Sequence, residues 1–83
     1  MYKNYEYITE RLTECPEGTT VRIKEISAGR GAVINLMNLG LNVDNVITIS
    51  RKSSFKGPVL VTFRDSEIAI GNNLAQKIIV ERI

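Results

Sequence analysis

The amino-acid sequence predicts a mainly β protein, a small barrel of about five short strands that carries one short α-helix. Composition is the first observation: Ile and Val together number 18 against six Leu, and six Thr add to the β-branched total. Such side chains favour pleated strands over helices. Length is the second observation, because 83 residues are enough for one core and too few for two.

The first predicted strand follows a turn signal, Pro-Glu-Gly at 16–18. Val21 and Ile23 alternate with polar residues, and Ile26 follows out of step. We therefore predict a β-bulge near Glu25.

One clear helix is predicted after Gly29-Arg30-Gly31. Apolar residues recur there at helical spacing and form a stripe of Ala32, Val33, Leu36 and Met37. Gly40 stands where a left-handed residue commonly closes a helix, and Leu41 can fold back over the last turn. The helix should be about ten residues long and should need tertiary packing to hold it.

The remainder of the chain alternates between strands and turns. Ile47 and Ile49 can share one face of a strand, and Pro58 opens the next strand without removing an interior ladder bond. The predicted elements are a strand over 45–50, a loop over 53–57, a strand over 59–63, a hairpin turn over 64–67, a strand over 68–70, one helical turn over 74–76 and a strand over 78–80.

Five short strands in an open sheet would leave unpaired edges, and closure into a small barrel removes them. We therefore predict an SH3-like barrel over residues 12–83. Residues 1–11 stand apart as an N-terminal extension. Tyr5, Ile8 and Leu12 are spaced for one face of a short helix beginning near Asn4, and a frayed extension is the other interpretation.

Composition also limits the chemistry. The sequence has no His, a single cysteine at Cys15 and a net charge of +2. An imidazole base and the common metal-binding motifs are therefore absent, and Asp65 and Glu67 bracket a hairpin tip rather than a cleft. We expect no enzymatic activity, no cofactor and no tight metal site. The chain shows no signal peptide and no apolar run long enough to span a membrane, so we expect a cytoplasmic protein.

A candidate contact surface remains after the core has been assigned. Phe55 is a large apolar residue in a loop rich in Ser and Lys, and Leu39 lies off the helix stripe. Leftover apolar residues of this kind are typical of a protein-binding surface. The predicted partner-binding residues are Leu39, Leu41, Arg51, Lys52, Phe55 and Lys56. Two alternatives are a solvated loop and a nucleic-acid surface on which Phe55 stacks against bases.

Residues 29–41, with the sequence Gly-Arg-Gly-Ala-Val-Ile-Asn-Leu-Met-Asn-Leu-Gly-Leu, resemble the FeoA family of ferrous iron transport proteins. The match continues in Lys-Gly-Pro-Val at 56–59 and in the closing segment at 68–80, and it covers about residues 12–83. Two departures occur where the family pattern has glycine: Asp44 replaces the glycine of a Pro-Gly pair, and Lys56 replaces the first of two glycines.

The resemblance implies an SH3-like cytosolic accessory protein of bacterial ferrous iron uptake. It implies FeoB, the membrane transporter with a GTP-binding domain, as the partner that could recruit the protein to the inner face of the membrane. It also permits a stand-alone relative of the SH3-like domain of metal-dependent repressors. An adaptor that works by contact alone agrees with the lack of catalytic groups in the sequence.

Overall fold

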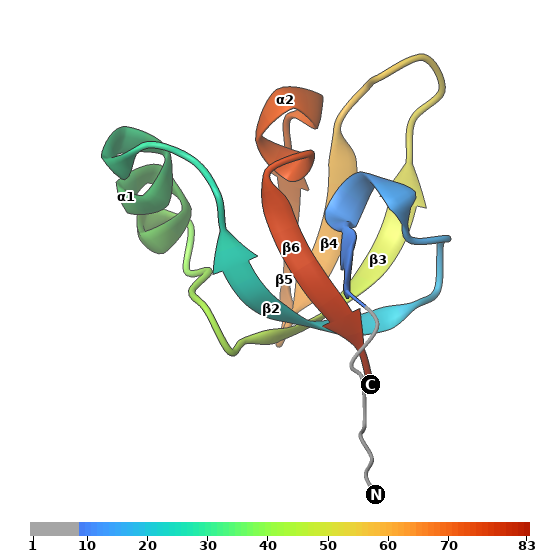
Figure 1. The fold of residues 1–83 in the computed structure, drawn as a ribbon. Helices are drawn as coiled ribbons and strands as arrows, with labels where there is room; N and C mark the ends of the chain where they lie inside the picture. The colour runs from blue at the N-terminus through green and yellow to red at the C-terminus, as the bar shows by residue number, and fades with distance from the viewer. Residues whose placement is uncertain (1–8) are drawn as a thin grey trace, which may run out of the picture.

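A computed structural model describes residues 9–83 of the chain. Short segments join its strands and helices (Figure 1). They are β1 (Thr9–Arg11), the 3-10 turn η1 (Leu12–Glu14), β2 (Thr20–Ile26), α1 (Arg30–Asn38), β3 (Val46–Lys52), β4 (Val59–Phe63), β5 (Ser66–Ile70), α2 (Asn72–Ala75) and β6 (Ile78–Arg82). The prediction of a mainly β fold with one main helix is confirmed. The described residues form six strands rather than about five.

The strands form one antiparallel sheet in the order β1-β6-β2-β3-β4-β5. Figure 1 shows that the sheet curves around the molecule. Within residues 9–83 the pairing runs in a single row with β1 and β5 at its edges, so the predicted closure of the barrel is incomplete. The edge strand β1 is only three residues long, which limits the unpaired backbone that it presents.

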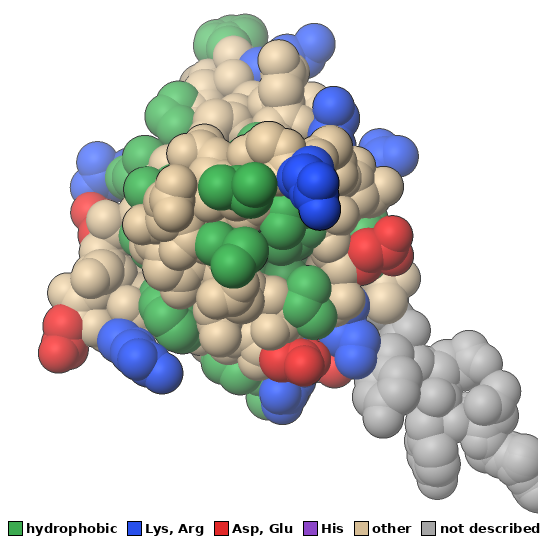
Figure 2. All heavy atoms as spheres, turned by 90° about the vertical axis from the view of Figure 1, so that its left-hand side faces the viewer, with side chains coloured by type: hydrophobic (Ala, Val, Ile, Leu, Met, Phe, Trp, Pro, Cys, Tyr) green, Lys and Arg blue, Asp and Glu red, His purple; other side chains and the backbone are tan. Residues whose placement is uncertain are grey.

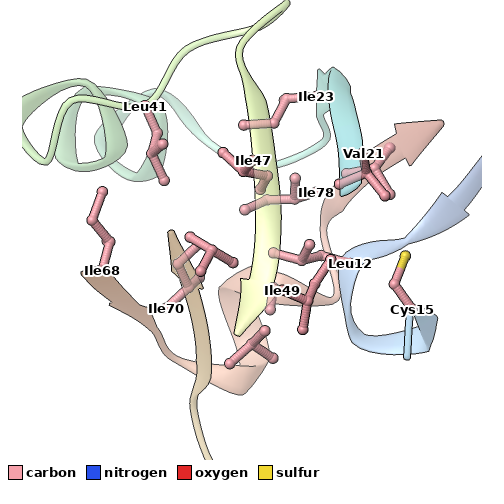
Figure 3. Close-up of a cluster of buried hydrophobic side chains, with 14 of the residues drawn as sticks. Leu12, Cys15, Val21, Ile23, Leu41, Ile47, Ile49, Ile68, Ile70 and Ile78 are labelled. Carbon is pink, nitrogen blue, oxygen red and sulfur yellow. The ribbon is translucent and has the colours of Figure 1, made fainter. Parts of the chain in front are cut away.

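The core lies inside the curve of the sheet (Figure 3). Its inward positions alternate along the strands: Ile47 and Ile49 are buried on β3, while Ser50 is exposed. This alternation confirms the predicted faces. The buried apolar side chains are Leu12, Cys15, Val21, Ile23, Leu36, Leu41, Ile47, Ile49, Val59, Val61, Ile68, Ile70, Ala75, Ile78 and Val80.

The irregularity predicted in the first long strand is present. The pairing of β2 with β6 shifts register between Ile23 and Glu25, which is the β-bulge expected from the broken alternation. The bulge bends β2 just before the chain leaves the sheet for α1.

Helix α1 ends where the sequence predicts, but fewer residues of its predicted apolar stripe are buried than expected. Gly40 has a φ of 95°, and its N–H donates to the carbonyl oxygen of Met37, as in a Schellman motif. Leu36 is completely buried, Val33 is half-buried and Met37 is 52% exposed. Met37, although it belongs to the predicted apolar stripe, is therefore not a core residue. Successive helix residues are turned by about 100°, so when Leu36 points into the core its neighbour Met37 turns toward solvent.

The segment before Leu12 differs from the helix considered for it. Thr9–Arg11 form β1 and pair with β6, and the carboxylate of Glu10 accepts hydrogen bonds from the guanidinium of Arg82 at 2.7 and 3.1 Å. A helix continuing to Leu12 is therefore wrong over Thr9–Arg11. The rest of the predicted extension, including Tyr5 and Ile8, lies outside the described residues.

Candidate functional site

Three segments that are distant in the sequence lie at one end of the molecule: α1, α2 and the loop 53–58 that joins β3 to β4. Figure 1 shows them along its upper side, while Ile83 lies at the lower end. We call these three segments the rim. Of the six predicted contact residues, Phe55 and Lys56 belong to the rim, and Leu39 and Lys52 directly adjoin it.

The loop 53–58 holds Phe55 away from the rest of the chain. Its side chain is 98% exposed. The loop is narrow because Lys52 and Val59 on either side of it are paired across β3 and β4. Phe55 and Lys56 are consecutive non-glycine residues with φ angles of 54° and 64°, in the left-handed region that such residues seldom adopt.

Gly57 allows the loop to close. A Cβ atom placed there would overlap the Cβ of Ser53 and would lie 2.9 Å from its Oγ. The N–H of Gly57 donates to the carbonyl oxygen of Ser54 at 3.3 Å. The loop therefore presents Phe55 from a tightly folded backbone.

The two leucines predicted for the contact surface have different positions. Leu39 caps the C-terminus of α1 and is 45% exposed, so it is available for contact. Leu41 is completely buried in the core and cannot belong to an exposed surface. Its place is fixed by the turn at Gly40, which directs the following residue back over the last turn of α1.

The three predicted cations lie on or beside the same loop. Arg51 is exposed and Lys52 is half-buried, and the backbone N–H of Lys52 donates to the carboxylate of Glu17 at 2.9 Å. Lys56 is exposed and contributes to a hollow that reaches α1 and α2. Of the three cations, Lys56 is the one that lines the same hollow as residues of both helices.

A trough runs between α1 and α2. One part, of about 500 Å³, is lined by residues of both helices and by Lys77. The other part, of about 460 Å³, is lined by Lys56 and by the start of α2. Asn35, Asn73 and Leu74 line both parts, which makes them neighbouring compartments of one open trough. The sequence analysis did not identify the trough, because its walls come from separate segments.

Further apolar side chains are exposed on α1 and on the segment that leads from it into β3. Ile34, Val43 and Val46 are 48%, 45% and 40% exposed. Figure 2 shows one side of the molecule, with hydrophobic side chains at several places on it. Sequence reasoning missed these three residues, although Ile34 could have been found as an apolar helix residue outside the predicted stripe.

The titratable groups with clearly shifted pKa values, Cys15, Glu10 and Arg82, are not part of the rim. Burial, followed by the nearby carboxylate of Glu10, raises the pKa of the Cys15 thiol to about 11. A thiol of this kind stays protonated at neutral pH and is a poor nucleophile. The hydrogen bond from Arg82 lowers the pKa of Glu10. In the part of the chain that the structure describes, no three His, Cys, Asp or Glu residues are grouped so that they could hold a metal ion.

The helices over residues 9–83 are too short or too polar to cross a membrane.

The architecture belongs to the class of small SH3-like β domains, and the comparisons with known proteins name the family. The FeoA domain model matches residues 10–82. A curated relative from Methanocaldococcus jannaschii, described as a putative Fe(2+) transport protein A, is 42% identical over 70 residues, which cover 84% of this chain and 83% of the relative. This chain therefore belongs to the FeoA family.

Solved structures show the same fold at lower identity. A crystal structure of an iron uptake regulatory protein, FeoA, has a TM-score of 0.83 at 24% identity and covers 92% of this chain and 100% of its own. A manganese-dependent transcriptional repressor has a TM-score of 0.86 at 21% identity, covering 95% of this chain and 44% of its own. The second match confirms that the fold is shared with a domain of a metal-dependent repressor.

Proposed function

We propose that this protein is a non-enzymatic accessory protein of ferrous iron uptake that binds the cytosolic part of a FeoB transporter and modulates its activity or assembly. Membership of the FeoA family and 42% identity to an Fe(2+) transport protein A support the pathway. The partner is the one that the family resemblance implies. Binding to it would hold the protein at the inner face of the membrane.

The exposure of Phe55 is the observation that carries the proposal. A phenylalanine that is 98% exposed gains nothing from folding, and its burial in a partner's pocket would remove a large apolar surface from water. The hydrogen bond from Gly57 to Ser54 and the pairing of Lys52 with Val59 restrain the loop, so less chain entropy would be lost on binding than for an unrestrained loop. These are the properties of a binding hot spot.

Leu39 supplies a second apolar contact in the proposed surface, and Arg51, Lys52 and Lys56 supply its polar edge. Charges at the edge of an interface mainly affect the association rate and the choice of partner. Within this surface, the two apolar side chains should therefore supply most of the binding energy. Leu41 is omitted from the surface because it is completely buried.

Co-purification with the cytosolic part of FeoB from the same organism tests the proposal. We expect Phe55→Ala to weaken binding at least about tenfold and Leu39→Ala to weaken it less, as for a central and a peripheral contact. Ile83→Ala is the matched control, since Ile83 is also exposed, at 68%, but lies at the opposite end of the molecule.

Circular dichroism should show the same fold for the wild type and all three variants. Wild-type affinity in both Phe55→Ala and Leu39→Ala would remove the proposed surface. Failure of the wild type to bind FeoB would remove the proposed partner.

A further inference from the structure

The trough between α1 and α2 has chemistry of its own, distinct from the apolar contacts of Phe55 and Leu39. Lys77 lines one compartment and Lys56 lines the other. The residues that line it include no carboxylate, and neither lysine makes an ion pair within residues 9–83. The trough thus presents two uncompensated positive charges, one in each compartment.

The middle of the trough is suited to a peptide backbone. Asn35 and Asn73 line both compartments. Neither carboxamide has a hydrogen-bond partner among the described residues. A carboxamide offers both N–H donors and a carbonyl acceptor, which matches the groups of an extended peptide. Asn72 differs, because its Oδ1 accepts a hydrogen bond from Gln76 at 2.6 Å.

Apolar surface accompanies these polar groups. Ala28, Ala32 and Leu74 line the compartment that contains Lys77, and each is half-buried. Small apolar side chains of a bound segment would cover them. Two lysines are few for a nucleic acid, whose affinity depends on neutralising many phosphates. Charge and shape therefore favour an acidic peptide.

We propose that the trough binds an extended acidic segment of the partner protein. Lys56 and Lys77 pair with its carboxylates, and Asn35 and Asn73 hydrogen bond to its backbone. The inference deepens the proposed function and rests on it for the identity of the partner. Lys56 follows Phe55 directly, so the segment would continue from the apolar contact of the loop into the trough.

Charge reversal tests the trough in the whole 83-residue chain. Binding of the cytosolic part of FeoB is measured by titration calorimetry for the wild type and for Lys56→Glu/Lys77→Glu. We expect at least a tenfold loss of affinity in this variant. The control is Arg11→Glu/Arg64→Glu, which changes the net charge equally at exposed positions that do not line the trough, and it should lose less than about threefold. If Lys56→Glu/Lys77→Glu is misfolded, Lys56→Gln/Lys77→Gln replaces it, with the same expected direction.

A second measurement does not depend on FeoB. A fluorescein-labelled peptide of alternating Asp and Ala, and its Asn and Ala counterpart, are titrated into the protein. We expect the acidic peptide to bind more tightly, to lose affinity in Lys56→Glu/Lys77→Glu, and to shift the NMR signals of the Asn35 and Asn73 side-chain amides.

The outcomes separate the two proposals. Full FeoB binding by the Lys56→Glu/Lys77→Glu variant would overturn the trough proposal and leave the proposed function standing. The wild type could fail to bind FeoB but bind the acidic peptide in a way that the Lys56→Glu/Lys77→Glu variant does not. This result would overturn the proposed partner and support an acidic ligand. A labelled single-stranded oligonucleotide is used in the same titration. If it bound more tightly than the acidic peptide and lost affinity in Lys56→Glu/Lys77→Glu, the peptide proposal would be overturned in favour of a nucleic-acid ligand.

Discussion

The backbone N–H of Leu41 donates a hydrogen bond to the carbonyl oxygen of Leu36 over 2.9 Å, and both side chains are completely buried. This bond spans the left-handed Gly40 and completes the Schellman motif at the end of α1. The apolar contact that commonly accompanies the motif anchors the helix in the core. The outward residues Met37 and Leu39 are therefore not needed to hold α1 in place.

Truncation of Leu36 should lower the stability of the fold much more than truncation of its neighbour Met37. We expect Leu36→Ala to lower the free energy of unfolding by about 2–5 kcal/mol, because it leaves a cavity under the only fully buried position of α1. Met37→Ala, at a 52% exposed position, should change it by less than about 0.5 kcal/mol. Urea unfolding measures both variants. Equal losses would show that Met37 packs in the core after all.

Gly57→Ala should distort the loop that carries Phe55. The added methyl group would overlap the Cβ of Ser53, so the backbone must move and the presentation of Phe55 must change. We expect weaker binding of the partner with little change in stability. Ser53→Gly removes the overlapping atoms, and the double variant Ser53→Gly/Gly57→Ala should recover binding. A double variant no better than Gly57→Ala would exclude this steric explanation.

Asp44→Gly should stabilise the protein. Asp44 has a φ of 78° although it is not a glycine, and its N–H donates to the carbonyl oxygen of Ile23 at 2.7 Å. Glycine would keep this bond and relieve a left-handed conformation that costs roughly 1 kcal/mol. Thermal unfolding should show a higher midpoint for Asp44→Gly. Asp44→Ala keeps the unfavourable φ and serves as the control, and it should show no such gain.

The ion pair between Glu10 and Arg82 should make stability depend on pH in the acid range. Arg82 lowers the pKa of Glu10 from its usual 4.5, so the folded state favours the carboxylate. The stabilisation is present above the unfolded pKa and is lost as the pH falls through the folded pKa. The difference in unfolding free energy between wild type and Glu10→Gln should therefore shrink on acidification. Glu10→Gln and Arg82→Gln should also be non-additive at neutral pH, and strict additivity would contradict a direct coupling.

The thiol of Cys15 should react slowly and should affect stability at alkaline pH. Its pKa is about 11 in the folded protein against an ordinary 9.0, so the folded state keeps a proton that the unfolded chain loses. The resulting stabilisation is complete below pH 9 and is lost as the pH rises to about 11. The difference in unfolding free energy between wild type and Cys15→Ala should fall over this range. A thiol reagent at pH 8 should label native protein at least ~100-fold more slowly than urea-unfolded protein, and rapid labelling would contradict the burial.

Much of the fold could be predicted because local patterns determine it. The alternation of Ile47 and Ile49 placed β3, the broken pattern near Glu25 placed the bulge, and Gly40 placed the end of α1. The three residues of β1 could not be predicted in the same way. Thr9–Arg11 lack apolar alternation and are strand because they pair with β6, about seventy residues away.

The candidate site was predictable only where one residue stands out in its local sequence. Phe55 is conspicuous among Ser and Lys, and the structure leaves it exposed. Leu41 was placed on the surface although the turn at Gly40 already indicated that it folds back over the end of α1. The trough could not be predicted, since Asn35, Lys56 and Asn73 meet only through tertiary structure.

Asp44 and Lys56, at the two positions where the family resemblance implies glycine, both have left-handed backbones. At the second position the side chain of Lys56 supplies one of the two charges of the trough.

The separation of the exposed contact residues from the core has an evolutionary consequence. Phe55 and Lys56 project from a loop, and Leu39 follows a helix that Leu36 already anchors. Substitutions at these sites should leave the scaffold intact, so the proposed contacts with a partner could change without loss of the fold. Such drift would leave relatives alike in architecture and divergent in specificity.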